Sequence, residues 1–475
     1  FDAMFTQMVL RGTGKRDGFS FDGFRELSGI ETTISEDDAQ FLEGMLGFFE
    51  RFAEQNSENT DLKYEAAQAF RRVANIYHLV GKFPDARQAY DRADRLYLEV
   101  FKINPQVSTL VERAQTMNEF GVLNLKLGDI RTANRVFQKT RTTLEQAADK
   151  TDPAVQLELV RTLNLMGSAV PFATTEALMR DRDVAAEDQP RRSRRGMSFR
   201  NRAERQYREA GKANMKLVQR AIQQLEELIA GHGDLAEYRL EHAKSHVRLA
   251  ELQYWAQDQT ASLASKQIAV DELTRLTDEI PDNPDYRALL AQVYAMPIGE
   301  DAESSLRELR RAYRISSDLT ESFPRNSDYA QLDAEINYQL GQLQKDEGAR
   351  EQAIEHWQTA LTTLVDVSSQ ARRNGLIQSR VQRLSFELAD LLVQERRFAE
   401  ARDVAQGSIT RLEALPLGRG RLAARGPILE RQYSMLSRIL ERLGERVAAR
   451  EAANKASELR ARQPRPGNDR RSSKK

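Results

Sequence analysis

The feature that most constrains this chain is a pattern of small and aromatic residues that recurs about every 47 residues. In its clearest copy a small anchor, Ala74, is followed by Gly81 seven residues on, by Ala86 at twelve and by Tyr90 at sixteen. Each anchor follows a bulky apolar residue, and the same steps run from Gly121, Gly341, Ala389 and Ser437. Self-similarity at such a period indicates an array of stacked supersecondary units.

The physical content of the pattern is two helices that cross closely. A small anchor lets a small residue of the second helix approach, and the aromatic residues fill the groove between neighbouring helices. Gly at the seventh step suits the left-handed residue that ends a helix. We therefore predict an all-α fold whose helices nest at Ala74/Ala86 and Gly341/Ala353.

This arrangement resembles the tetratricopeptide repeat, a helix–turn–helix unit of about 34 residues. The surplus length here follows the second helix, where Tyr97, Leu98 and Phe101 continue a helical periodicity toward Pro105. The resemblance implies a right-handed α-solenoid of about eight tetratricopeptide-like helix pairs with long helices. An unrelated helical bundle whose periodicity arose by chance is the alternative.

The predicted units have anchors at 74, 121, 167, 250, near 298, 341, 389 and 437. In the unit near Ile298, Pro297 and Gly299 interrupt the first helix. Three units open on related segments, at 233–238, 281–286 and 324–329. Each of these segments predicts a loop, a capping polar residue and the first turn of a helix.

The flanks and one insertion complete the predicted organisation. Residues 1–34 are rich in Gly and are expected to form a linker or arm. Ser35 then caps a helix to about Gln55, which is expected to seal the array, with docking on a missing upstream domain as the alternative. Residues 35–168 then hold this helix and the first units, 169–201 form a polar basic insert, 202–464 hold the remaining units, and 465–475 form a basic disordered tail. Because the chain begins at Phe1 and not at Met, we expect it to be a piece of a larger protein.

The insert carries a basic run, for which two interpretations stay open. One is an anion-binding or phosphorylatable loop, and the other is a solvated, mobile insertion. The run consists of Arg191, Arg192, Ser193, Arg194 and Arg195.

Composition excludes several classes of function. The 475 residues contain 71 Lys plus Arg and 71 Asp plus Glu, so no overall charge recruits nucleic acid or anionic lipid. Cysteine is absent, which excludes disulfides, thiolate metal sites and a Cys nucleophile. Uninterrupted apolar stretches reach only about five residues, so no membrane span is expected.

No catalytic constellation stands out either. Gly12-Thr13-Gly14-Lys15 lacks the spacing of a phosphate-binding loop, and no histidine is followed by the Arg-Asp of a kinase catalytic loop. His242 and His246 lie four residues apart and could share a metal ion, but no third ligand is apparent. We therefore predict no catalytic residues, cofactor or metal, with an enzyme using a cryptic site at these histidines as the alternative.

A ligand is expected on the first helices, which line the concave side of stacked pairs. Some tetratricopeptide proteins clamp a terminal carboxylate there, and Arg71 and Asn75 match that clamp, whereas Glu119 and Leu165 depart from it. A looser polar groove is predicted instead, with an ordinary solvated helix surface as the alternative. Its residues are Arg71, Asn75, Gln115, Asn118, Arg161 and Asn164.

Several segments also resemble the tetratricopeptide regions that follow the kinase domain of large bacterial serine/threonine protein kinases. They are residues 35–55, 70–90 and especially 234–250, whose sequence is DLAEYRLEHAKSHVRLA. The helical array and the absence of catalytic constellations predict a protein- or peptide-binding scaffold, the interaction or regulatory region of a larger signalling protein. The resemblance implies the alternative, the sensory region of a membrane-anchored kinase. Partner identity, compartment and oligomeric state stay open.

Overall fold

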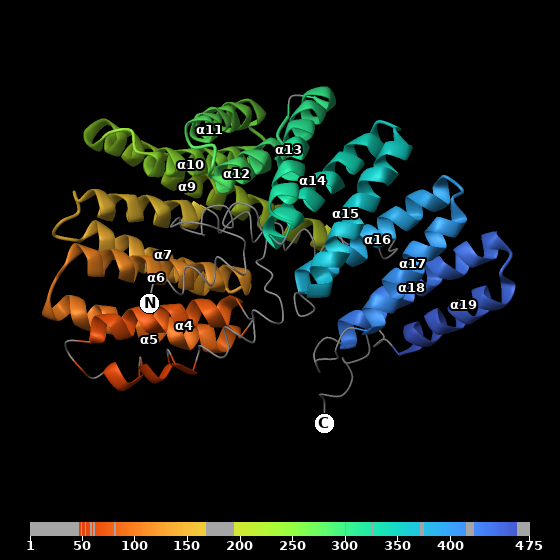
Figure 1. Cartoon of the computed structure of the whole chain (residues 1–475), viewed down its shortest axis with the longest axis horizontal. Coiled ribbons are helices and arrows are strands. Elements are labelled where there is room, and N and C mark those ends of the chain that lie inside the picture. Colours follow the sequence, from red (N-terminus) through yellow and green to blue (C-terminus); the bar gives the residue numbers. More distant parts are fainter. Residues whose placement is uncertain are drawn as a thin grey trace. The chain divides into compact units, whose positions relative to one another are not determined.

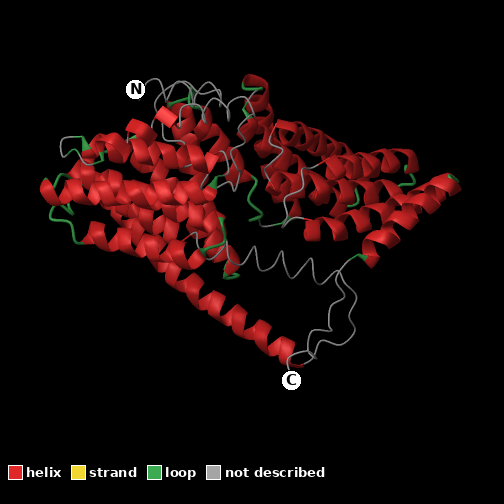
Figure 2. Cartoon of the chain, turned by 90° about the horizontal axis from the view of Figure 1, so that it is seen from below, coloured by secondary structure: helices red, strands yellow, loops and turns green. Residues whose placement is uncertain are grey.

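The computed structural model describes residues 47–167 and 194–462, apart from short gaps at 49, 53, 58, 60–61, 80–81, 300, 325, 371–374 and 415–421. Throughout these ranges the regular elements are helices, as predicted, and none of the described residues lies in a strand (Figures 1 and 2). The chain divides into two compact units, Phe1–Arg325 and Asn326–Lys475.

The first unit is built from consecutive helix pairs. Its helices are α4 (Lys63–Leu79), α5 (Phe83–Ile103), α6 (Val107–Lys126), α7 (Ile130–Glu145), a helix over residues 153–167, α9 (Arg194–His232), α10 (Ala236–Trp255), α11 (Gln259–Glu279), α12 (Pro284–Tyr294) and α13 (Ala302–Ser322). Each first helix packs on the helix that follows it, and each pair packs on the next.

The second unit repeats the same construction. Its helices are α14 (Ser327–Asp346), α15 (Arg350–Gln370), α16 (Gly375–Gln394), α17 (Phe398–Ala414), α18 (Leu422–Leu443) and α19 (Arg446–Ala461). The described helices of the two compact units form eight helix pairs. This confirms the predicted all-α array of about eight repeats.

The small anchors are the points where paired helices nest, as predicted. Ala74 and Ala86 are both fully buried. At Gly121 an added Cβ would lie 2.1 Å from the ring of Phe137, far inside van der Waals contact. At Gly341 it would lie 2.3 Å from the ring of Trp357, which itself is fully buried. The aromatic ring of the second helix therefore occupies the volume that a larger anchor would need.

The seventh step ends the first helix through a left-handed residue, also as predicted. Gly128, Gly348 and Gly444 have φ of 74°, 83° and 81°. In the turn at Gly128 the Asp129 amide donates to the Asn124 carbonyl at 2.9 Å, which satisfies a carbonyl that the helix end leaves free. Two units place other residues at this step, and Gln257 and Arg396 adopt φ of 65° and 60°.

The surplus length of each repeat lengthens its helices. The helix α5 runs for 21 residues and α6 for 20, and the last turns of α5 bury Leu96 and Tyr97. The long helices predicted from residues 97–101 are therefore present in the first pair.

The predicted interruption of the helix near Ile298 is present, and a buried lysine binds the backbone carbonyl groups that it leaves free. Its first helix, α12, spans only 11 residues and ends at Tyr294. The buried Lys266 ammonium of α11 donates to the carbonyl of Ile298 at 2.8 Å and to that of Met296 at 3.3 Å. It also meets the Glu308 carboxylate at 2.6 Å. One lysine thus satisfies the irregular backbone that replaces the missing helical turns.

The three unit-opening segments each bury a tyrosine, namely Tyr238, Tyr286 and Tyr329. Asn283 and Asn326 cap their helices as predicted, accepting hydrogen bonds from backbone amides in the first turn. At 233–238 the capping position is Leu235, which has no side-chain acceptor, so the predicted polar cap is absent there.

Several boundary predictions fall partly or wholly outside the described residues. Residues 1–34, Ser35 and the tail from 465 lie outside them, whereas Phe52, at the end of the predicted capping helix, packs on the core of α4 and α5. The helix α9 begins at Arg194, inside the span 169–201 predicted as an insert, and not near Arg202. No helix in the described part of the chain has the length and apolar character needed to cross a bilayer.

Candidate functional site: a polar ladder on the first helices

The predicted groove residues lie on the first helices of the first unit, where side chains bind one another from helix to helix. This polar ladder crosses α4, α6, the helix over residues 153–167 and α10. Its members are Tyr64, Gln68, Arg71, Glu112, Gln115, Asn118, Glu119, Glu158, Arg161, Thr162, Asn164, Glu237, Glu241, Lys244 and Ser245.

Arg71 joins α4 to α6. Its Nε lies 3.1 Å from each carboxylate oxygen of Glu119, and its Nη1 donates to the Gln115 Oε1 at 3.1 Å. The Arg71 and Glu119 side chains are 23% and 17% exposed, so the ion pair lies partly out of water. A guanidinium already bound to a carboxylate is electrically compensated before any ligand arrives.

Asn75 sits one turn along α4 and faces its own pair. Its Oδ1 accepts a hydrogen bond of 2.5 Å from the Tyr90 hydroxyl of α5. Asn75 therefore joins the two helices of one pair, whereas Arg71 joins the first helices of two neighbouring pairs.

The second rung connects α6 to the helix over residues 153–167. The Asn118 amide donates to the Glu158 carboxylate at 2.7 Å and to the Thr162 hydroxyl at 2.9 Å. Asn118 is only 5% exposed and Glu158 only 2% exposed, so this rung lies inside the array. Burial raises the pKa of Glu158, although Arg161 and the Asn118 amide favour its ionised form.

The third rung connects residues 153–167 to α10. Arg161 donates to Glu237 at 2.7 Å and approaches Glu241 at 3.4 Å. Burial opposes ionisation of Glu241, but Lys244 and Arg161 hold its pKa below the usual range. Nearby, the Asn164 amide donates to the Ser245 hydroxyl at 2.8 Å.

The ladder carries more negative than positive charge. Its acids are Glu112, Glu119, Glu158, Glu237 and Glu241, and its cations are Arg71, Arg161 and Lys244. Their exposure differs, because the Glu237 side chain is 49% exposed and that of Glu119 17%, whereas Glu158 and Glu241 are buried. A chain of zero net charge thus carries an acidic excess along these helices, and Glu237 is its most exposed part.

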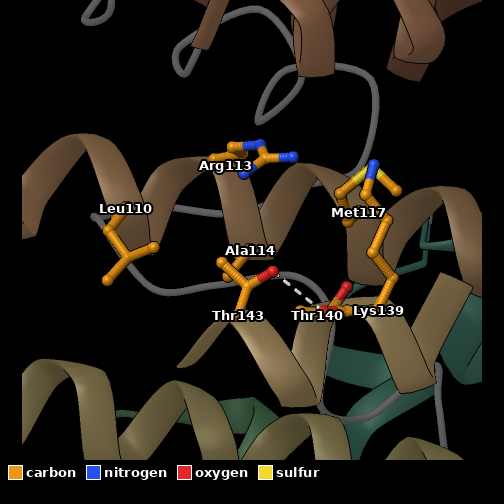
Figure 3. Close-up of a pocket in the computed structure, with 7 residues that line it drawn as sticks. All are labelled: Leu110, Arg113, Ala114, Met117, Lys139, Thr140 and Thr143. Carbon is orange, nitrogen blue, oxygen red and sulfur yellow. Dashed lines mark hydrogen bonds between the residues drawn. The ribbon is translucent and has the colours of Figure 1, made fainter. Parts of the chain in front are cut away.

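Figure 3 shows a small hollow between α6 and α7, lined by Leu110, Ala114 and Met117. Two cations stand at this hollow, and both bind Asp94, Arg113 at 2.6 Å and Lys139 at 3.1 Å. Thr140 and Thr143 also line it, and their hydroxyls donate to the backbone carbonyls of Val136 and Lys139.

Most of the basic run at 191–195 lies outside the residues that the structure describes. Residues 191–193 lie outside the described residues, and residues 194 and 195 fall in the first turn of α9. The interpretation of this run as an anion-binding or phosphorylatable loop is not tested by these elements.

The acidic partners in the ladder went unrecognised in the sequence, although the repeat itself contained a signal for them. Glu119 lies 48 residues after Arg71, and Glu158 lies 40 residues after Asn118. These separations are close to one repeat, so equivalent positions of neighbouring first helices were the natural places to look. Arg161 and Glu237 are 76 residues apart because the insert interrupts the period.

Comparison with known proteins gives likenesses only among solved structures. No family model matches the chain, and no curated protein matches it. BtubC from P. vanneervenii is 16% identical with a TM-score of 0.37, covering 55% of this chain and 96% of its own. A thermophilic tetratricopeptide protein of Thermus thermophilus is 14% identical with a TM-score of 0.30, covering 57% and 98%. A signal-transduction ATPase with a tetratricopeptide repeat sensor from Pyrococcus horikoshii is 10% identical with a TM-score of 0.38, covering 94% and 66%. Likenesses at this level say nothing of partner or activity.

Proposed function

We propose that this chain is a binding scaffold whose polar ladder takes an extended, basic segment of a protein or peptide. The observation that supports this most directly is the acidic excess along adjacent first helices, with Glu237 half-exposed at its edge. A terminal carboxylate is a poor candidate for the same surface, because Arg71 and Arg161 are already bound by glutamates.

The repeat geometry favours an extended ligand. Packed helices lie about 8–10 Å apart, and an extended chain advances about 3.3 Å per residue. A peptide crossing the first helices would therefore meet a new helix about every three residues. Lys or Arg side chains of such a peptide would reach the partly exposed Glu119 of α6 and the half-exposed Glu237 of α10.

The test is fluorescence anisotropy of the full chain with labelled peptides of equal length, in which Lys, Glu or Ser is placed at every third position. We expect the Lys peptide to bind most tightly and its affinity to fall as salt rises, because the attraction is between partly exposed charges. Tighter binding of the Glu peptide would overturn the proposal.

A charge-matched control separates the ladder from general electrostatics. Glu237→Lys reverses a ladder charge, whereas Glu303→Lys makes the same change on α13, where Glu303 is 82% exposed. We expect Glu237→Lys to weaken the Lys peptide by at least tenfold and Glu303→Lys to leave it within twofold. Equal losses would mean that net charge and not the ladder controls binding.

We propose as a narrower version that the scaffold is the sensory or docking region of a serine/threonine kinase. The support is the resemblance of residues 234–250 to the regions that follow such kinase domains. The coding sequence upstream of residue 1 tests it, since a kinase domain and a membrane span are expected there. A coding sequence with neither would remove this version and leave the scaffold untouched.

A further inference from the structure

Two histidines of α10 form a close pair on the side of the helix that packs against its neighbours. His242 and His246 are one helical turn apart, with ring centroids separated by 4.6 Å and ring planes inclined at 74°. His246 is 8% exposed, and the His242 side chain is 12% exposed. The chain's other three histidines have no histidine at this spacing.

The polar atoms of this pair lack hydrogen-bond partners. Both ring nitrogens of His242, the Nδ1 of His246 and the Oε2 of Glu272 are buried without a partner. A neutral imidazole carries one N–H donor and one acceptor, and leaving such groups buried and unpaired destabilises the folded state. Four unpaired atoms from three neighbouring side chains indicate that another group satisfies them.

The surroundings favour a cation held by neutral imidazoles. Glu272 of α11 places its Oε1 3.9 Å from the His242 Nδ1, and Glu226 of α9 adds a second negative charge facing His242. A metal ion binds imidazole through a ring nitrogen that carries no proton, and unpaired ring nitrogens are what these two side chains offer.

We propose that His242 and His246 bind a divalent transition-metal ion of the zinc class, with Glu272 orienting His242. Glu272 lies on the Nδ1 side of the His242 ring at 3.9 Å, so it would have to move closer to accept the Nδ1 proton, and Nε2 would then be the ligand. This carboxylate–histidine–metal relation is how proteins fix the tautomer of a ligating ring. Imidazole nitrogen suits Zn²⁺, Ni²⁺ and Cu²⁺ and does not suit Mg²⁺ or Ca²⁺.

The proposed site would have fewer protein ligands than a closed structural site. Within the described residues no three His, Cys, Asp or Glu side chains converge to hold an ion, so the chain supplies two nitrogens and water supplies the remaining ligands. The ion would cross-link two residues of one turn of α10 and, through Glu272, would also stabilise the contact between α10 and α11. Glu241 and Ser245 of the ladder lie on the same two turns of α10, so ion binding would also stiffen that part of the ladder.

The experiment is isothermal titration of the full, metal-stripped chain with Zn²⁺ alone and with Mg²⁺ alone. We expect one Zn²⁺ per chain and no Mg²⁺. We also expect His246→Gln to weaken Zn²⁺ binding by at least a hundredfold and Glu272→Gln to weaken it about tenfold. His232→Gln, which changes an exposed histidine at the end of α9, should leave it within twofold.

Two further readouts keep the test decisive. Helical circular dichroism of each variant identifies any that fails to fold, and the absorption bands of bound Co²⁺ in the unchanged chain report nitrogen ligation without any substitution. Absence of stoichiometric Zn²⁺ binding, unchanged binding in the His246→Gln variant, or Co²⁺ bands typical of water and carboxylate ligands would each overturn the proposal and leave a buried water as the occupant.

Discussion

Replacing the anchor Gly341 by Ala tests the nesting of paired helices directly. The added methyl group would lie 2.3 Å from Cδ1 and 2.4 Å from Nε1 of Trp357, and 3.1 Å from the Ala353 carbonyl oxygen. Trp357 has little room to withdraw, because it is fully buried and its Nε1 donates to the Tyr338 carbonyl at 3.1 Å.

Three terms set the magnitude. Overpacking a filled core costs about 1–3 kcal/mol. Displacing the indole also weakens its hydrogen bond, at about 1 kcal/mol. Ala is favoured over Gly inside a helix by about 1 kcal/mol, which partly offsets these costs. We therefore expect Gly341→Ala to destabilise its unit by roughly 1–3 kcal/mol.

The assay is urea unfolding followed by tryptophan fluorescence in a Trp255→Phe background. Trp255 is 45% exposed and lies in the first unit, so its removal leaves Trp357 as the reporter of the second. Gly211→Ala, in the first unit, is the control and is followed through Trp255 in a Trp357→Leu background, since nothing lies within 4 Å of the added methyl group at that helical position. It should stabilise its helix by about 0.5–1 kcal/mol.

A double-mutant cycle isolates the contact. In a Trp357→Leu background the ring is gone, so Gly341→Ala should cost little or become stabilising. If Gly341→Ala raised the stability of the protein as Gly211→Ala does, or cost the same with and without the ring, the nesting argument would be wrong.

Three further outcomes are expected. Arg396→Gly and Gln257→Gly should each stabilise the protein by about 0.5–1 kcal/mol, because both residues adopt positive φ that Gly adopts without strain; unfolding midpoints check this. Lys266→Met should cost about 2–4 kcal/mol, because two buried carbonyl groups and Glu308 lose their donor, and urea unfolding of the first unit measures it. Burial raises the pKa of Glu158, so its contribution to stability is present below about pH 4 and is lost as the pH rises. The stability of Glu158→Gln relative to the unchanged protein should therefore increase as the pH rises from 4 to 7. A relative stability that falls over this range would contradict the raised pKa of Glu158.

The architecture could be predicted from local residues because each repeat contains the residues that set its own helix pairing and turn. A small anchor, a turn residue at the seventh step and an aromatic ring at the sixteenth act within about 20 residues. Their roles depend on helical geometry alone, so Gly121 and Phe137 could be paired without knowledge of any other unit.

The binding surface could be predicted only as a set of positions. That Arg71 and Arg161 lie on first helices follows from periodicity, but their compensation by Glu119 and Glu237 depends on how neighbouring pairs stack. Asn118 shows the same limit, because its burial against Glu158 comes from a helix 40 residues away.

The sequence by itself therefore determined the helix pairs, their closest approaches and the turns that join them, since these follow from contacts within one repeat. Only the tertiary structure decided the charge of the ladder and the surroundings of His242 and His246. The spacing of the two histidines is visible in the sequence, whereas their burial and the approach of Glu272 arise when α9 and α11 pack on α10. Electrostatic environment is a property of the assembled array, because every charge in it is set by neighbours that the local pattern does not specify.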